Sequence, residues 1–165
     1  MDYTFEKGAA ADIDAVMANI LDVRTNGVTD WDEEYPAREH IEEDAREGAL
    51  YVLRASDASV AGSIVMYIDD VSFEEDTAGA GWSKAEKSAS LFRLCVKTKL
   101  QGQGIGARMV QSAMDAARAE GCDAVRLLAS VENDTANRLY ERLGFTRKGR
   151  VCVYEGWFNA YEKAL

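Results

Sequence analysis

The sequence has few of the residues that build disulfide frameworks or metal clusters. Its three cysteines, Cys95, Cys122 and Cys152, are far apart and show no C-x-x-C spacing, and His40 is the only histidine. An odd number of separated cysteines argues against a disulfide framework, and one histidine argues against a histidine–cysteine zinc cluster. We therefore interpret the cysteines as reduced core residues and expect no bound metal.

Long apolar runs and an excess of basic charge are also missing. No apolar run approaches the length that spans a bilayer, and the start Met1-Asp2-Tyr3 lacks the pattern of a secretory signal. The 19 basic residues against 29 acidic ones give a formal net charge of -10, which repels phosphate backbones and anionic lipid headgroups. We expect a cytoplasmic protein that binds neither nucleic acid nor membranes.

The hydrophobic pattern predicts one α/β domain over residues 1–165. The chain is 47% hydrophobic, which is enough for a core, and no repeat or proline-rich linker indicates a second domain. Periodicity and turn residues predict the order β-αα-βββ-α-β-α-ββ, with residues 69–87 as a loop. The predicted strands cover residues 3–6, 50–55, 60–68, 90–96, 124–130, 145–154 and 157–163, and the predicted helices cover residues 9–24, 37–47, 105–120 and 134–143. Gly48, Gly121 and Gly144 are placed to end three of these helices.

A glycine-rich segment, residues 101–106 (QGQGIG), joins a predicted buried strand to a helix. Glycine lets backbone approach a ligand without a Cβ in the way, and the free amides of a helix's first turn favour a phosphate. The order strand, glycine loop and helix therefore indicates an anion site, with a plain structural turn as an equal alternative. Gly102, Gly104 and Ala107 also fit a dinucleotide fingerprint, but Asp123, its expected ribose-binding acid, precedes the next strand instead of ending it.

Two motifs resemble the GCN5-related N-acetyltransferase (GNAT) superfamily. Gln101, Gly104 and Gly106 satisfy its Q/R-x-x-G-x-G/A motif, and residues 133–145 (NDTANRLYERLGF) satisfy N-x-x-A-x-x-L-Y-x-x-x-G-F at the expected separation. The resemblance implies a single N-acetyltransferase domain with a mixed, mostly antiparallel sheet, a splayed parallel strand pair and flanking helices. It also implies that an acetyl group moves from acetyl-CoA to a primary amine of a small molecule, peptide or protein by direct attack, without a covalent enzyme intermediate.

The resemblance further implies where acetyl-CoA binds as cosubstrate. The end of the buried strand would hold the pantetheine arm, and the amides of the glycine loop would surround the pyrophosphate. The residues implied in cofactor binding are Leu94, Cys95, Val96, Gln101, Gly102, Gln103, Gly104, Ile105, Gly106, Ala107, Asn133 and Ala136. Asn133 is equally suited to cap its helix. Lys99 and Arg108 either reach the phosphates or are ordinary surface charges, and we favour the second interpretation.

Tyr140 is the implied catalytic residue. It shares one helical face with Ala136 and Leu143, as a core residue would. By resemblance its hydroxyl gives a proton to the departing CoA thiolate, and we favour this role over packing alone. A backbone amide near Val96 can stabilise the oxyanion, whereas Cys95 is a poor candidate nucleophile on an apolar strand.

The acceptor amine must lose a proton before it attacks, so some carboxylate should accept that proton. The candidate bases are Glu34, Asp69, Asp70, Glu74 and Glu75. For each of them a solvated surface acid is the simpler interpretation.

Residues 27–36 (GVTDWDEEYP) place Trp31 and Tyr35 among four carboxylates. By resemblance this region lines the acceptor pocket, and aromatic faces with carboxylates suit a cationic amine. A hydrophobic anchor under an acidic surface is an equal alternative. Two rival functions stay open: a non-catalytic acyl-CoA-binding sensor or scaffold, and an acyltransferase that uses another acyl group or acceptor. The sequence does not identify the acceptor, the general base or the oligomeric state, and a homodimer is one option.

Overall fold

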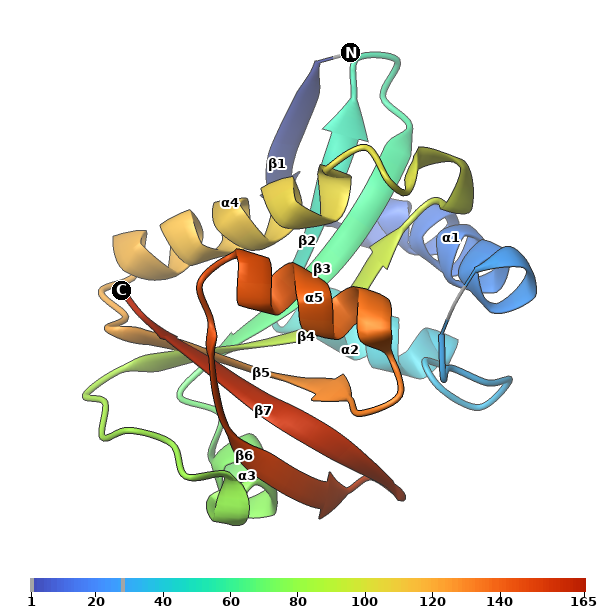
Figure 1. Ribbon diagram of the computed structural model, residues 1–165. Coiled ribbons are helices and arrows are strands. Elements are labelled where there is room, and N and C mark those ends of the chain that lie inside the picture. Colours follow the sequence, from blue (N-terminus) through green and yellow to red (C-terminus); the bar gives the residue numbers. More distant parts are fainter. Residues whose placement is uncertain (1, 28) are drawn as a thin grey trace. The chain divides into compact units, whose positions relative to one another are not determined.

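The computed structural model describes residues 2–27 and 29–165 (Figure 1). Met1, and Val28 of the predicted loop 27–36, lie outside the described residues. Seven strands are hydrogen-bonded in the order β1-β2-β3-β4-β5-β7-β6, and β4–β5 is a parallel pair among antiparallel ones. This confirms the mixed, mostly antiparallel sheet. The chain packs as two compact units, residues 1–66 with 93–113 and residues 67–92 with 114–165. The single domain stays a prediction.

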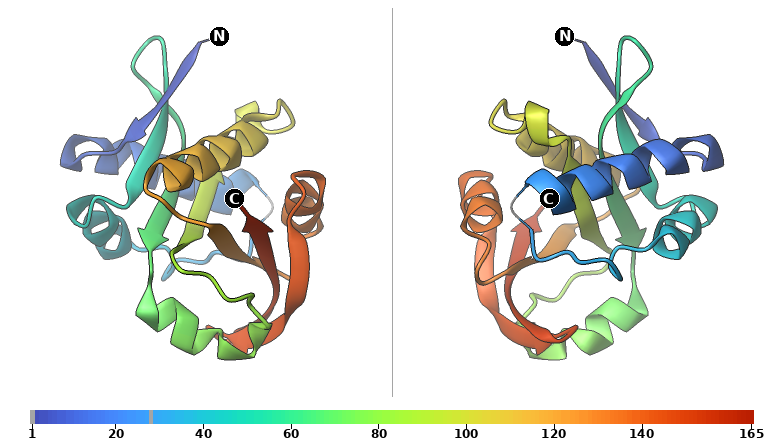
Figure 2. Two further views of the ribbon diagram at one scale, coloured as in Figure 1. Left: turned by 90° about the vertical axis from the view of Figure 1, so that its left-hand side faces the viewer. Right: turned by 90° about the vertical axis from the view of Figure 1, so that its right-hand side faces the viewer.

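The first unit contains the N-terminal strands and helices. Its elements are β1 (Tyr3–Lys7), α1 (Ile13–Asn26), α2 (Arg38–Arg46), β2 (Leu50–Ala55), most of β3 (Val60–Ile68), the end of β4 (Ser88–Val96) and the start of α4 (Ile105–Ala119). Within this unit α1 and α2 lie on one side of the strands, and α4 begins on the other side (Figure 2). Val16, Ile20 and Val23 are buried on α1, as the helical spacing predicts.

Gly62 on β3 determines how closely α4 approaches the strands of the first unit. A Cβ at this position would lie 2.6 Å from the Cys95 carbonyl oxygen and 2.8 Å from the Met109 sulfur. Met109 is fully buried on α4. The absence of a side chain at Gly62 therefore lets α4 rest directly on the backbone of β3.

The second unit contains the C-terminal strands. Besides the start of β4 and the end of α4, its elements are α3 (Val71–Asp76), β5 (Ala124–Ser130), α5 (Asp134–Arg142), β6 (Thr146–Val153) and β7 (Gly156–Ala164). Helix α5 lies over β5 and β7 (Figure 1). The parallel ladder joins only Ser88–Ser90 to Ala124–Arg126, although β5 stays paired with β7 as far as Ser130. This short ladder fits the splayed pair that the resemblance implies.

The loop predicted over residues 69–87 is wrong in its first half. Helix α3 covers Val71–Asp76, and a 3₁₀ turn follows at Ala78–Ala80. The Asp70 side chain caps α3 by accepting a hydrogen bond of 3.1 Å from the Phe73 amide, and Phe73 is buried. A helix of six residues with one buried side chain gives no periodic signal. Because α3 interrupts the predicted βββ run, the order is β-αα-ββ-α-β-α-β-α-ββ.

The glycines placed at helix ends behave as predicted. Gly48, Gly121 and Gly144 have φ values of 69°, 86° and 86°, in the left-handed region that glycine adopts without a Cβ penalty. These residues confirm the predicted ends of α2, α4 and α5.

The prediction that all three cysteines are core residues is wrong for one of them. All are free, and Cys95 and Cys122 are buried, but Cys152 is exposed. Cys152 follows buried Val151 on β6, so strand alternation points its side chain to the solvated face. Over the described residues, no helix is long and apolar enough to cross a membrane, and no group of three metal-binding side chains is found.

The packing at Gly62 generates a stability prediction. Gly62→Ala should lower the free energy of unfolding by about 1–3 kcal/mol, because the new methyl group overpacks against backbone and a fully buried methionine. Urea denaturation measures this loss. Gly79→Ala is the matched control, since a Cβ there meets nothing within 4 Å. Equal stabilities of the two variants would contradict the close contact.

Candidate functional site

The end of β4 leads into the predicted cofactor segment. Cys95 and Val96 are buried and Leu94 is half-buried. After Val96 the chain makes a 3₁₀ turn at Thr98–Leu100, and the Thr98 amide donates a hydrogen bond of 2.8 Å to the Asp22 carboxylate on α1. The strand end is thus fixed to α1 before the glycine loop begins.

The glycine loop has left-handed backbone at two positions. Gly102 and Gly104 have φ values of 79° and 80°, and a Cβ on either would meet no protein atom within 4 Å. Residues 101–104 are exposed. The glycines are therefore required by backbone conformation, and the space beside them is open.

The side chain of Gln101 makes a hydrogen bond across this loop. Its Nε2 donates a hydrogen bond of 3.1 Å to the Val96 carbonyl oxygen, across the turn between β4 and α4. Gln103 makes a longer contact of 3.4 Å to the Lys99 carbonyl. The glutamine of the motif thus holds the loop in shape.

Helix α4 begins with backbone amides that suit an anion. The Gly104 carbonyl accepts the bond from the Arg108 amide at 3.0 Å, so the amides of Ile105, Gly106 and Ala107 belong to the first turn, which lacks intrahelical acceptors. This turn contains no acidic residue. The helix dipole adds positive potential at the same point. The loop therefore fits a phosphate or pyrophosphate.

Two basic residues beside this loop differ in their contacts. Arg108 donates a hydrogen bond of 3.0 Å to the Tyr3 carbonyl, and its guanidinium lies 5.7 Å from the Tyr3 ring centroid. Lys99 is exposed, and its ammonium group has no partner among the described residues. The contacts of Arg108 favour the structural interpretation of that residue.

The second motif forms α5 in the second unit. The Asn133 side-chain oxygen accepts a hydrogen bond of 3.1 Å from the Ala136 amide, which makes Asn133 the N-cap. Ala136 is half-buried. The neighbouring Asn137 donates hydrogen bonds to the carbonyls of Ser130 and Asn133 and accepts one of 2.8 Å from Asn159 on β7. These bonds fix α5 to the strands beneath it.

Tyr140 lies on the inward face of α5, as predicted. Its ring packs against Phe145 and Tyr161 at centroid distances of 5.8 Å. Desolvation of the phenol raises the pKa of Tyr140 to about 12. The described residues give this hydroxyl no hydrogen bond, and it is not among the fully enclosed polar atoms that lack a partner. A buried ring therefore carries an uncommitted, protonated hydroxyl.

The predicted acceptor loop is ordered by Asp32. The Asp32 carboxylate accepts hydrogen bonds from the amides of Glu34 and Tyr35, at 2.8 and 3.0 Å. Trp31 is half-buried, whereas Tyr35 is 40% exposed. The structure brings Tyr35 to β4, where its hydroxyl accepts a hydrogen bond of 2.8 Å from Arg93.

Arg93 is the residue that sequence reasoning missed. It lies in β4 directly before Leu94, with φ of 52°, and forms two hydrogen bonds of 2.9 and 2.7 Å to the buried Asp44 carboxylate. The sequence does mark this residue, because Arg93 interrupts the apolar stretch LFRLCV. A charged side chain within a buried strand calls for a partner elsewhere in the chain.

Three of the five candidate bases accept hydrogen bonds from nearby groups, and the other two are exposed. Asp69 accepts a hydrogen bond from the Ser88 amide, and Asp70 caps α3. Glu74 accepts weak hydrogen bonds from the side chains of Ser88 and Arg126. Glu34 and Glu75 are exposed. None of these carboxylates is set apart as a general base.

Burial raises the pKa of Cys95 to about 12, and the Asp22 carboxylate adds to this effect. Its thiol is therefore protonated at neutral pH. This agrees with the prediction that Cys95 is a core residue and a poor nucleophile.

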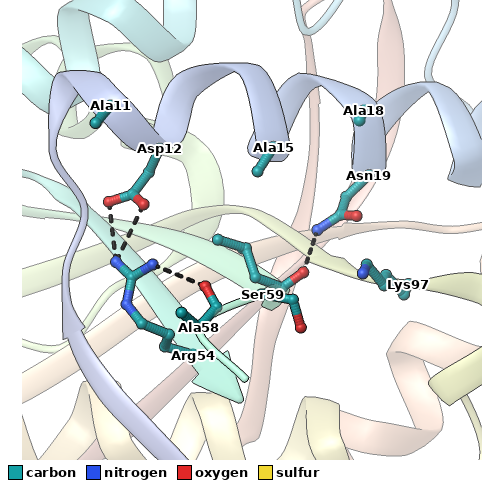
Figure 3. A pocket seen from close by; sticks show the side chains of 10 residues that line it. Ala11, Asp12, Ala15, Ala18, Asn19, Arg54, Ala58, Ser59 and Lys97 are labelled. Carbon is teal, nitrogen blue, oxygen red and sulfur yellow. Dashed lines mark hydrogen bonds and ion pairs between the residues drawn. The ribbon is translucent and has the colours of Figure 1, made fainter. Parts of the chain in front are cut away.

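The first unit also contains a groove of about 440 Å³, between the first turns of α1 and the turn that joins β2 to β3 (Figure 3). Arg54 pairs with Asp12 at one end, and Asn19 donates a hydrogen bond of 3.0 Å to the Val60 carbonyl at the other. Lys97 lines the groove beyond Asn19. None of the predicted site residues lines it.

The chain is similar in sequence to known acetyltransferases. The model of the acetyltransferase (GNAT) family matches residues 17–145. N-alpha-acetyltransferase 30 of Saccharomyces cerevisiae is 39% identical over 61 residues, which are 37% of this chain and 35% of that relative. The human N-alpha-acetyltransferase 30 is 35% identical over 86 residues, 48% of this chain and 24% of its own length. The chain thus spans about a third of the first relative and about a quarter of the second.

Two solved structures share the fold over nearly the whole chain. A GNAT-family acetyltransferase from Streptococcus agalactiae 2603 superposes with a TM-score of 0.84 at 19% identity, covering 99% of this chain and 95% of that one. A chain of the NatC complex, solved with a Gag peptide and CoA, superposes with a TM-score of 0.72 at 20% identity, covering 100% and 99%.

The glycine loop generates a binding prediction. Acetyl-CoA at 100 times its Kd should stabilise the protein by about 2.7 kcal/mol and raise Tm, whereas NADH and ATP should not match it. Gly104→Asp should abolish the rise, because its carboxylate would repel the pyrophosphate. Gly104→Asn is the matched control, since asparagine tolerates the same left-handed backbone without the charge. A full rise in Gly104→Asp, measured by thermal denaturation, would contradict this placement.

Proposed function

Because the chain belongs to the acetyltransferase (GNAT) family, we propose that it transfers an acetyl group from acetyl-CoA to a primary amine. The family match confirms the resemblance first seen in the two motifs. The observation that carries the proposal is the open loop with left-handed Gly102 and Gly104 in front of the first-turn amides of α4. Left-handed glycines also end helices elsewhere in this chain, so it is their place directly before the free amides of α4 that supports an anion site.

The cofactor residues follow from this assignment. The amides of Ile105, Gly106 and Ala107, with the loop residues 101–104, would hold the pyrophosphate. The backbone of Leu94, Cys95 and Val96 would follow the pantetheine arm. Asn133 uses its oxygen as a helix cap, which leaves its amide group to donate to the arm. Ala136 would lie against the arm on the same face of α5 as Tyr140.

In the proposed reaction a neutral amine attacks the thioester carbonyl directly. A backbone amide near Val96 would stabilise the oxyanion, and the Tyr140 hydroxyl would act on the departing thiolate. The raised pKa of Cys95 supports a mechanism without a covalent enzyme intermediate. The Tyr140 phenol is protonated at neutral pH, as this role requires, and burial raises its pKa further, to about 12.

We propose the α-amine of a peptide as the acceptor. The two relatives described above are both named N-alpha-acetyltransferase 30, and one structural neighbour was solved with a peptide and CoA. An α-amine of pKa about 7.7–8.0 is roughly one-quarter neutral near pH 7.4, whereas a lysine amine of pKa about 10.4 is only about 0.1% neutral. An α-amine therefore has little need of a strong base, which fits a site where no carboxylate stands out. A cationic acceptor, a homodimer and a cytoplasmic location stay predictions.

The test is CoA release from acetyl-CoA across peptides with free N-termini, amino acids, polyamines and aminoglycosides. Peptide N-termini should give the highest kcat/KM. Matched peptides with a blocked N-terminus and one free lysine are the control, and they should react at least tenfold more slowly. Binding of acetyl-CoA without turnover of any acceptor would instead support the sensor or scaffold, and turnover of longer acyl-CoA alone would support another acyl group.

Tyr140 gives a kinetic prediction. Tyr140→Phe should lower kcat by about 10²–10⁴-fold and leave the Kd of acetyl-CoA nearly unchanged, because it removes a transition-state interaction. An acyl donor with a more acidic thiol should recover part of the loss. Full kcat in Tyr140→Phe, with chemistry shown to limit the rate, would make Tyr140 a packing residue.

A further inference from the structure

Three residues of the first unit, distant in sequence, meet at the end of the acceptor loop. Arg93 on β4 donates two hydrogen bonds to Asp44 on α2, at 2.9 and 2.7 Å, and one of 2.8 Å to the Tyr35 hydroxyl. The guanidinium also lies 5.9 Å from the Tyr35 ring centroid. One side chain thus connects β4, α2 and the loop.

The geometry of Arg93 is unusual for a strand residue. Its φ of 52° lies in the left-handed region, which a long L-side chain occupies only when surrounding contacts require it. The three half-buried residues Phe92, Arg93 and Leu94 interrupt the alternation of β4 at this point. The distortion turns the guanidinium toward Asp44 and Tyr35, where its hydrogen bonds are made.

The ion pair between Arg93 and Asp44 limits what else the guanidinium can bind. The bidentate pair with Asp44, whose side chain is 2% exposed, neutralises the guanidinium. Arg93 therefore does not offset the exposed Asp30, Glu33 and Glu34 of the loop, nor is it free to bind an anionic ligand. It contacts the loop through a hydrogen bond to the Tyr35 hydroxyl and through the Tyr35 ring.

We propose that Arg93 is a positioning residue for acceptor binding. This inference rests on the proposed function, in which the amine must reach a thioester held along Leu94–Val96. Arg93 directly precedes those residues, so by fixing Tyr35 it fixes the exposed end of the acceptor loop beside them. Asp44 fixes Arg93 in turn. The loop then receives the acceptor in a preformed arrangement, which lowers the entropic cost of binding.

Tyr35→Phe is the least disruptive test, because it removes one exposed hydroxyl and keeps the ring against His40. With the peptide acceptor from the panel, KM should rise about three- to tenfold, as expected for one lost hydrogen bond, with kcat within twofold. The Kd of acetyl-CoA should not change. Tyr154→Phe is the matched control, since it removes an exposed hydroxyl that contacts Asp76 in the second unit, and all its constants should stay at wild-type values.

A double-mutant cycle assigns the effect to Arg93. Arg93→Lys keeps the charge but loses the planar fork, so it should raise the acceptor KM in the same direction. Tyr35→Phe should then add little in the Arg93→Lys background, because the contact is already lost. If Arg93→Lys does not fold, Tyr35→Phe alone decides.

The outcomes separate the two proposals. An unchanged acceptor KM in Tyr35→Phe, or full additivity in the cycle, would overturn the positioning role while wild-type transfer upholds the proposed function. Failure of the wild-type protein to acetylate any acceptor would overturn both.

Discussion

The turn from β4 into α4 depends on a backbone conformation that only glycine adopts without penalty. Gly102 and Gly104 both have left-handed φ within three residues, where an L-side chain costs roughly 1–2 kcal/mol at each position. The Gln101 side chain and the Thr98–Asp22 bond hold the turn closed without burying it. Where α4 starts also sets where Met109 falls, against Gly62. The exposed loop and the packed interior of the first unit thus share one constraint.

Each unit buries an arginine in an ion pair, in a protein whose 29 acidic residues outnumber its 19 basic ones. In the first unit Arg93 pairs with Asp44. In the second unit Arg126, 5% exposed, pairs with Glu162 at 2.9 Å, donates to the Ser83 carbonyl at 2.6 Å, and lies 5.4 Å from the Trp82 ring centroid. A buried ion pair often stabilises no more than well-packed apolar residues would. The planar guanidinium instead makes hydrogen bonds in fixed directions. In both units these bonds attach an irregular segment of the chain to a strand.

The sequence predicts features that depend on neighbouring residues better than features that depend on contacts between distant segments. The helix-ending Gly48, Gly121 and Gly144 and the strands Leu50–Ala55 and Ala124–Ser130 follow from local pattern, and their bounds agree with the structure. Helix α3 is too short for periodicity, and Cys152 needs knowledge of which face of β6 is solvated. The two motifs predict the glycine loop and Tyr140 as site residues, and their functional roles stay predictions. The contact of residues 35, 44 and 93 joins three separate elements, and no local pattern in one sequence contains such a pairing.

Tyr140 has two properties that act in opposite directions under the proposed function. Burial keeps its phenol protonated, with a pKa raised to about 12, but the same shift makes the phenol a weaker acid. Because burial raises the pKa of the phenol, complete transfer of its proton is harder than from a solvated tyrosine. The hydroxyl is better suited to donate a hydrogen bond to sulfur while the carbon–sulfur bond breaks, when charge on sulfur is only partly developed. Under the proposed function, the attacking amine would supply through solvent the proton that neutralises the thiolate, and Tyr140 would need no reprotonation before the next cycle.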